Sequence, residues 1–376
     1  MLILCACGIA YLTVALIAVL RFERRRIPAM SSSPGVTILK PVHGPEAELF
    51  ENLCSFCAQD YPRFQVIFGV QRHDDPALGI VRRVIDRFPE RDLLLVLGES
   101  AFSGNPKVAN VTAMMSRAKH DLIFVADADM RVDPRYLASV AAEFSGDRVG
   151  AVTCLYAGAS CGGFASDLAA LQLNDQFGPS VLVATLAGDP QFCFGSTMAV
   201  RRDALEAIGG FEALAQHLAD DYMLGAMVEA RGYRVVLSRY VVSNVVSEAN
   251  VRALVEHELR WARTIRSVRP LGYAFSFLSY PLPFALAFLA ASGGSATAWG
   301  VLSAIVALRL ATHYAVRRAF EQSSVPPPWL IPLRDCLGLA VWAAGLFGNT
   351  VRWQQHAIAI EKDGQISDSS STFRTE

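Results

Sequence analysis

Two acidic residues follow a short apolar run in the first half of the sequence. Residues 122–126 are apolar, and Asp127 and Asp129 come directly after them with one residue between. Alternate residues of an extended segment project to the same side, so both carboxylates can face one ligand. Their hard oxygen atoms suit Mg²⁺ or Mn²⁺, which in turn neutralises a diphosphate. A solvated turn is the alternative, but ligands of an open parallel sheet bind at the carboxyl ends of its strands, which favours a metal and diphosphate site.

A second acidic pair, Asp220 and Asp221, stands where a helix running to residue 230 is expected to begin. Adjacent helical residues point about 100° apart, so only one of the two would face a substrate. One interpretation is that these acids cap the helix and stabilise its dipole. The functional interpretation is a general base that takes the proton from an attacking hydroxyl group. The sequence alone leaves both interpretations open.

A basic amphipathic stretch runs from His257 to Arg266, immediately before an apolar segment. One interpretation is an interfacial helix that places Trp261 and its arginines at the level of lipid headgroups. In the other, Arg260 reaches a leaving diphosphate, because a guanidinium group pairs bidentately with phosphate oxygens. The two roles are compatible.

The acidic pairs need a scaffold, and residues 34–265 have the pattern of a soluble α/β domain. Short apolar runs rich in β-formers alternate there with charged amphipathic segments. Several runs are apolar on both faces, as in the buried strands of a mainly parallel sheet that helices cover on both sides. We therefore predict a Rossmann-like domain with strands at residues 36–39, 65–70, 93–97, 122–126 and 149–155.

The sequence also predicts membrane segments at both ends of this domain. Residues 2–20 form an almost uninterrupted apolar run, near the ~20 residues that a helix needs to cross a bilayer. The arginines that follow it predict that the chain after residue 21 lies in the cytoplasm. A cleaved signal peptide fits poorly, because it would carry its charge before the run. We expect a multi-pass protein of the inner cell membrane.

Residues 266–351 are expected to hold the interfacial helix and a C-terminal helical membrane region. Long apolar stretches occupy residues 271–292, 296–316 and 329–349, with breaks rich in Gly, Ser or Pro. The sequence does not decide whether the third stretch crosses the membrane. Residues 352–376 are predicted to be a partly disordered tail.

Composition excludes one class of partner. The chain is 52% hydrophobic and 18% charged, and its formal net charge is −1. Binding to nucleic acid needs a clustered excess of Lys and Arg, so we expect no nucleic-acid partner. Cys54 and Cys57 have C-x-x-C spacing, but no second pair follows to complete a zinc site. We interpret them as small apolar residues on a helix face.

Taken together, the motifs resemble a known enzyme family. They follow the order and spacing of a D, D, D, (Q/R)-x-x-R-W signature, and several shorter segments match as well. The chain resembles the ceramide glucosyltransferase family of GT-A glycosyltransferases, and within it most the bacterial hopanoid-biosynthesis glycosyltransferases. The matching residues are Asp75 in His73-Asp74-Asp75-Pro76, Asp127 to Pro134, Asp221, His257-x-x-Arg260-Trp261, Lys40-Pro41, Gln59-Asp60-Tyr61-Pro62, Gly104-Asn105-Pro106-Lys107, Gly195-Ser196-Thr197 and Gly209-Gly210-Phe211.

The resemblance implies roles for the acidic residues. Asp75 would contact the nucleotide, and Asp127 and Asp129 would hold the metal, Mg²⁺ or Mn²⁺, and the diphosphate. Asp221, beside Asp220, would be the base in a single displacement that inverts the anomeric centre.

The resemblance also implies roles for basic and aromatic residues at the donor. Arg260 and Trp261 would close over the donor phosphates, and Lys107 would face the donor. His257 stands where the signature has Gln or Arg. This departure argues against ceramide as the acceptor.

The leading hypothesis is therefore the transfer of a sugar from a UDP-sugar to the hydroxyl of a membrane lipid. The resemblance to the hopanoid branch suggests N-acetylglucosamine as the sugar and a bacteriohopanetetrol-type polyol as the acceptor. Ceramide glucosylation from UDP-glucose is the second hypothesis. A processive polysaccharide synthase would need a sealed membrane channel, for which about four segments near the spanning length are few. A scaffold protein without turnover predicts a broken carboxylate set, whereas this sequence keeps its acids.

Overall fold

The computed structural model describes residues 1–30, 32–98, 104–188, 190–322, 326–348, 350–353, 356–360 and 365–367. The chain divides into two compact units. The sheet unit comprises Arg26–Tyr156 and Ala187–Val245, and the helical unit comprises Met1–Arg25, Ala157–Leu186 and Val246–Glu376. Residues 157–186 lie inside the predicted α/β domain in sequence, but they group with the helical unit.

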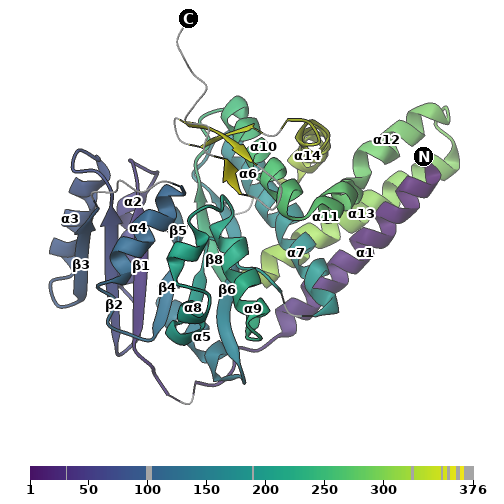
Figure 1. Ribbon diagram of the computed structural model, residues 1–376. Helices are drawn as coiled ribbons and strands as arrows, with labels where there is room; N and C mark the ends of the chain where they lie inside the picture. The colour runs from purple at the N-terminus through teal and green to yellow at the C-terminus, as the bar shows by residue number, and fades with distance from the viewer. Residues whose placement is uncertain are drawn as a thin grey trace, which may run out of the picture. The chain divides into compact units, whose positions relative to one another are not determined.

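The sheet unit is built on an eight-stranded sheet with the order β3-β2-β1-β4-β7-β6-β8-β5 (Figure 1). β1 pairs in parallel with β2 and β4, and β2 pairs in parallel with β3. β7 runs antiparallel to β4 and β6, and β5 runs antiparallel to β8. The strands are β1 Val36–Val42, β2 Phe64–Val70, β3 Asp92–Leu97, β4 Leu122–Val125, β5 Met130–Arg131, β6 Val149–Ser160, β7 Met198–Arg201 and β8 Arg234–Val246.

The sheet reverses its strand order between β1 and β4. The chain builds outward from β1 to β2 and β3, then returns to place β4 on the other side of β1. In open α/β sheets such a switch point leaves a crevice at the carboxyl ends of the two strands, where ligands bind. Asp127 lies just beyond the end of β4, so the fold delivers the first acidic pair to this position.

Two hydrophobic clusters show that helices cover both faces of the sheet. Phe124 of β4 belongs to the cluster that holds Phe56 and Tyr136, whereas its neighbour Ile123 belongs to the cluster that holds Leu224. This opposite burial of adjacent residues is the expected alternation of a strand. Cys57 is buried in the first cluster, as a small apolar residue on its helix. The helices of the unit are α2 Leu49–Cys57, α3 Ala77–Arg87, α4 Pro106–Met115, α5 Tyr136–Ala142, η1 Glu143–Ser145, α8 Arg202–Ala207, η4 Phe211–Leu214 and α9 Asp220–Ala230.

The helical unit contains the apolar segments from both ends of the sequence. Part of the predicted tail pairs there as the antiparallel strands β10 and β11, and β9 pairs with β10. The elements are α1 Leu2–Arg24, α6 Phe164–Gln172, the π-helix η2 Leu173–Phe177, α7 Gly178–Ala184, η3 Thr185–Ala187, α10 Val251–Val268, α11 Pro270–Phe275, η5 Ser276–Ser279, α12 Pro281–Ala291, α13 Ala296–Ala319, η6 Pro328–Leu330, α14 Ile331–Gly345, β9 Thr350–Trp353, β10 His356–Ile360 and β11 Ile366–Ser367.

Among the described residues, α1 and α13 are long and apolar enough to cross a membrane. The segments Pro270–Ser279 and Pro281–Ala291 pass the same test together, but they are bent by 53° at the break between them. This bent pair is a third candidate span if it acts as one. α14 covers 15 residues, fewer than the ~20 of a spanning helix.

Buried charged side chains in the helical unit occur in pairs. Arg309 Nη2 lies 2.7 Å from Asp335 Oδ1, and its Nε donates a second hydrogen bond of 3.1 Å to Asp335 Oδ2. Arg334 donates two hydrogen bonds of 2.8 Å to the two carboxylate oxygens of Glu258. Bidentate pairs of this kind neutralise both charges and join the helices that carry them.

Candidate active site

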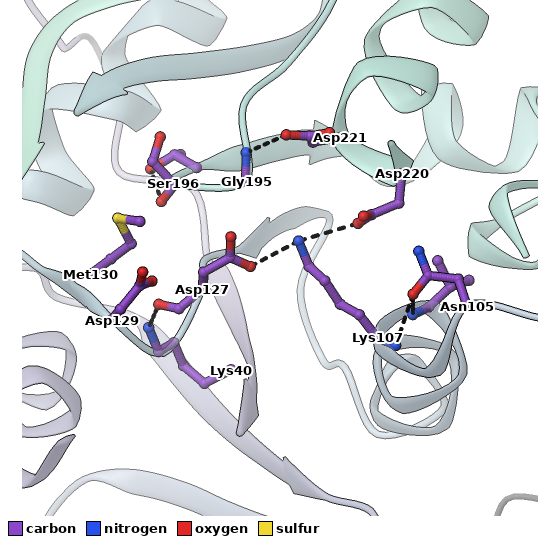
Figure 2. Close-up of polar contacts among 12 residues, drawn as sticks. Lys40, Asn105, Lys107, Asp127, Asp129, Met130, Gly195, Ser196, Asp220 and Asp221 are labelled. Atoms are coloured by element: carbon purple, nitrogen blue, oxygen red, sulfur yellow. Dashed lines mark hydrogen bonds and ion pairs between the residues drawn. The ribbon is translucent and has the colours of Figure 1, made fainter. Parts of the chain in front are cut away.

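The loop after β4 is held by contacts to its backbone. Lys40, near the end of β1, donates a hydrogen bond of 2.5 Å from Nζ to the carbonyl oxygen of Asp127. The Asp127 N–H group donates to the carbonyl of Gly195 at 3.2 Å. Asp129 Oδ2 accepts a hydrogen bond of 2.8 Å from Asn244 Nδ2. The first two contacts fix the backbone of Asp127, as Figure 2 shows for Lys40, and the third orients the carboxylate of Asp129.

Lys107 joins the two acidic motifs. Its Nζ atom lies 2.8 Å from Asp127 Oδ1 and 3.2 Å from Asp220 Oδ2, and Figure 2 shows it between the two carboxylates. The lysine stands in the first turn of α4, where Asn105 caps the helix by accepting from Lys107 N–H at 2.9 Å. Burial alone would lower the pKa of Lys107, but the neighbouring carboxylates outweigh it and raise that pKa. Lys107 is therefore a cation in this site.

Asp221 is linked to the first motif through one residue, Gly195. Its Oδ2 accepts a hydrogen bond of 2.8 Å from the N–H of Gly195, the residue whose carbonyl accepts from Asp127. A methyl group at position 195 would collide with Asp127 Oδ2, so the close approach requires glycine. Burial, and then the charge of Asp220, raise the pKa of Asp221 to about 6. A carboxylate with this pKa suits general-base catalysis near neutral pH.

The other two carboxylates also hold protons more strongly than usual. Burial, with the charge of Asp127, raises the pKa of both Asp129 and Asp220. The site therefore concentrates negative charge that its own lysines offset only in part. An arrangement with this charge can accept a cation and, through it, a diphosphate.

Asp75 is in a different hydrogen-bond group of the sheet unit. Its Oδ1 accepts from the N–H groups of Gly44 at 3.0 Å and Ala77 at 2.8 Å, and its Oδ2 lies 3.1 Å from His43 Nδ1. The carboxylate is buried and connects the loop after β1 to the start of α3. Its predicted contact with the nucleotide stays a prediction.

The remaining predicted residues lie on α10 of the helical unit. His257 Nδ1 lies 2.9 Å from Glu248 Oε1, and its ring centroid is 4.3 Å from that of Trp261. Arg260 follows on the same helix. The structure thus brings together Lys107, Asp127, Asp220 and Asp221 with Asp129 beside them, while the α10 residues form a group within their own unit.

Sequence reasoning did not assign a role to Lys40 or Asn244. Lys40 is fully buried, and its Nζ lies 3.8 Å from the centroid of the Phe56 ring. Burial lowers its pKa to about 8. A lysine inside an otherwise apolar strand was a usable signal, because an unpaired ammonium group is costly to bury. Asn244 gave no such signal, since its contact with Asp129 depends on the pairing of β5 with β8.

The sequence of the chain matches a known family of glycosyltransferases. The sequence profile of glycosyl transferase family 21 matches residues 1–366. The chain belongs to glycosyl transferase family 21. Ceramide glucosyltransferase 3 of Caenorhabditis elegans is 29% identical over 238 residues, which cover 62% of this chain and 51% of that protein. The ceramide glucosyltransferase of Komagataella phaffii is 33% identical over 114 residues, covering 29% of this chain and 22% of that protein.

These relatives confirm the predicted family, and a solved structure confirms the fold. The matched regions span about half the length of the C. elegans relatives. A mannosyltransferase of Pyrobaculum calidifontis, solved with GDP-Man and Mn²⁺, superimposes with a TM-score of 0.57 at 22% identity, covering 92% of this chain and 99% of that one. The family 21 chain therefore has the GT-A type of glycosyltransferase fold that the sequence predicts.

Proposed function

We propose that this family 21 protein is an inverting, membrane-bound glycosyltransferase that moves a sugar from a UDP-sugar to the hydroxyl of a membrane lipid. The convergence of Asp127, Lys107, Asp220 and Asp221 at the switch point of the sheet carries the proposal. The family match, the ceramide glucosyltransferase relatives and the apolar helices α1 and α13 support it. The cytoplasm is the proposed side of the sheet unit, as the arginines after residue 20 predict.

Asp127 and Asp129 suit a divalent cation. Burial, and then the charge of Asp127, raise the pKa of Asp129, and a cation between the two carboxylates would relieve their repulsion. In the part of the chain that the structure describes, no three His, Cys, Asp or Glu side chains are placed to hold a metal ion. Mg²⁺ and Mn²⁺ accept such a partial set, because substrate phosphates and water complete the shell. The bound cation, Mg²⁺ or Mn²⁺, would supply charge neutralisation of the diphosphate.

Asp221 is the proposed base. Its carboxylate takes the proton of the acceptor hydroxyl as that oxygen attacks the anomeric carbon, the bond from this carbon to the donor phosphate oxygen breaks, and UDP leaves. The Gly195 N–H group orients this carboxylate, and burial holds its pKa near the working range. Lys107 pairs with Asp220 and offsets part of the rise that burial causes in the pKa of Asp220. Arg260 and Trp261 are proposed to bind at the donor phosphates, and Asp75 at the nucleotide.

For the acceptor, we propose a hopanoid polyol of the bacteriohopanetetrol type, with N-acetylglucosamine as the sugar. His257 supports this choice, because it stands where the signature has Gln or Arg and so departs from the general pattern of the ceramide enzymes. The second candidate is ceramide with UDP-glucose, which the names of the relatives favour.

The test is a reaction of the full-length protein in lipid nanodiscs with Mg²⁺ or Mn²⁺. UDP-N-acetylglucosamine or UDP-glucose is supplied with the polyol or with ceramide, and lipid products are identified by mass spectrometry. We expect one sugar on the polyol from the wild type. The Asp221→Asn variant should lose about 10²- to 10⁴-fold in rate, the usual contribution of a general base. Asp203→Asn, an exposed acid in α8, is the matched control.

Each other product has a stated meaning. Glucosylceramide would replace the proposed acceptor by the second candidate. A lipid carrying a long sugar polymer would indicate a processive synthase. No product and no UDP release with either lipid would refute the proposed function.

A further inference from the structure

Two lysines approach Asp127 from different directions. Lys40 Nζ contacts the backbone carbonyl, whereas Lys107 Nζ contacts the carboxylate oxygen Oδ1 (Figure 2). A metal ion or its phosphate complex would use the carboxylate and leave the carbonyl untouched. Lys107 therefore occupies the position on the Asp127 carboxylate that a metal ion would take, whereas Lys40 does not.

The two lysines also differ in freedom. Lys40 is fully buried against the ring of Phe56, and this burial leaves its side chain no room to move away from the loop that carries Asp127. The Lys107 side chain is 17% exposed, and the Asp127 side chain that it contacts is 34% exposed. The backbone of Lys107 is fixed by the Asn105 cap, so that movement is restricted to its long side chain. Only Lys107 can leave Asp127 without disturbing the core.

We propose that Lys107 is a displaceable counterion that makes metal binding at Asp127 depend on the donor diphosphate. The inference rests on the proposed function and concerns the same site. Without the donor, the ammonium group of Lys107 neutralises Asp127 and Asp220 together and competes with a divalent cation. When the diphosphate is present, its oxygens offer the ammonium group a new partner, and Asp127 becomes available.

Charge pairing explains why the exchange needs the donor. An ammonium group in a largely buried site is costly unless it keeps an anionic partner. Asp220, whose side chain is only 11% exposed, lies 3.2 Å from Lys107 Nζ and is the partner that the ammonium group would keep on leaving Asp127. The phosphate oxygens then replace the lost contact. Metal and diphosphate therefore bind cooperatively, beyond the attraction that they have for each other.

The test measures Mn²⁺ binding, not turnover. Full-length protein in nanodiscs is titrated with Mn²⁺, and free Mn²⁺ is followed by electron paramagnetic resonance with and without UDP. Lys107→Met should bind Mn²⁺ at least about tenfold more tightly than the wild type when UDP is absent, within the roughly 5- to 150-fold range of coupled binding. UDP should also tighten Mn²⁺ binding by a smaller factor in this variant than in the wild type.

Lys40→Met is the matched variant, because it removes the same charge near Asp127 without freeing the carboxylate. Its affinity for Mn²⁺ should change much less. Lys119→Met, which removes an exposed lysine paired with Asp92, controls for charge at a distance and should behave as the wild type. Lys107→Gln should repeat the result of Lys107→Met and replaces it if that protein does not fold.

Two results would overturn the inference and leave the proposed function standing. One is equal Mn²⁺ affinity in the wild type and Lys107→Met with the effect of UDP unchanged. The other is equal tightening by Lys40→Met and Lys107→Met, which would reduce the effect to net charge. Absence of Mn²⁺ binding in every protein, even with UDP, would refute the metal site and the inference together. Failure of the proposed function alone would appear as normal Mn²⁺ and UDP coupling without a glycosylated lipid.

Discussion

The helical unit and the sheet unit treat buried charge in opposite ways. In the helical unit, Arg309 meets Asp335 through two hydrogen bonds, and Arg334 meets Glu258 in the same manner. In the sheet unit, four aspartates gather around two lysines, and the pKa of several carboxyl groups is raised. A buried pair whose charges neutralise each other in this way has little attraction for a charged ligand. An excess of like charge is a cost to folding that a bound cation relieves, and this marks the sheet unit as the place of chemistry.

The largest expected effect breaks a closed pair. Arg309→Met leaves the buried carboxylate of Asp335 without its cation and should cost about 3–5 kcal/mol of stability. The double variant Arg309→Met with Asp335→Leu should recover most of the loss, because two apolar side chains replace the pair. Thermal unfolding of the three proteins in detergent measures both steps. A single variant as stable as the wild type would mean that the pair contributes no stability.

A smaller effect is expected at Gly195, whose backbone lies close to the carboxylate of Asp127. Gly195→Ala places a methyl group against Asp127 Oδ2 and should displace the carboxylate by a fraction of an ångström or more. Misplacement of about 1 Å can reduce turnover by roughly 10²-fold. We expect kcat to fall on that scale while the melting temperature stays close to that of the wild type. Loss of stability in step with activity would show that Gly195 has a role in folding instead. Gly79→Ala, at a position with open space around it, is the control.

The pH profile of kcat/KM tests the raised pKa of Asp221. The base acts when it is deprotonated, so the rate should fall below about pH 6 and reach about one tenth of its plateau near pH 5. Asp220→Asn removes the charge that helps to raise this pKa and should move the acidic limb to lower pH. An acidic limb that stays in place would assign the titration to another group.

The smallest expected effect concerns the support of Lys107. Asn105→Ala removes the side chain that caps α4 by accepting from the N–H groups of Lys107 and Val108. Loss of such a cap costs about 1 kcal/mol, and the same change removes the hydrogen bond of 2.9 Å from Asn105 Nδ2 to the carbonyl of His217, worth about 1 kcal/mol more, so the melting temperature should fall by several degrees. Ser116→Ala, at the other end of the same helix, should be nearly neutral because Ser116 is exposed. A drop in Ser116→Ala that equals that of Asn105→Ala would contradict the capping role.

The sequence predicted the parallel strands of the sheet, because each of them is an apolar run that can be recognised from consecutive residues. β1, β2, β3 and β4 are apolar runs, and the structure places them within a few residues of the predicted bounds. β7 has four residues, too short to stand out, and β8 mixes polar and apolar residues across Arg234–Val246. In the antiparallel half of the sheet, β6 was predicted over residues 149–155 and extends to Ser160, whereas β5, β7 and β8 were not predicted, because these strands are defined by their neighbours.

The candidate site shows the same division between local and long-range information. The position of Asp127 and Asp129 after a strand was readable, since it depends on a few consecutive residues. The contacts of Lys107 with Asp220, and of Gly195 with Asp221, join parts of the chain that are far apart in sequence. Such contacts between distant parts of the chain cannot be predicted from one sequence. The assigned roles of the residues are predictions until the variants are measured.

The first helix has a practical consequence for work on this protein. Cys5 and Leu12 of α1 are buried in one cluster with Leu282 of α12 and Ile305 of α13, and Glu23 pairs with Arg318. α1 is thus a structural component of its bundle and not an interchangeable tether. Removing α1 to obtain a water-soluble preparation would expose the apolar residues of α12 and α13 that it covers, and we expect the protein to aggregate.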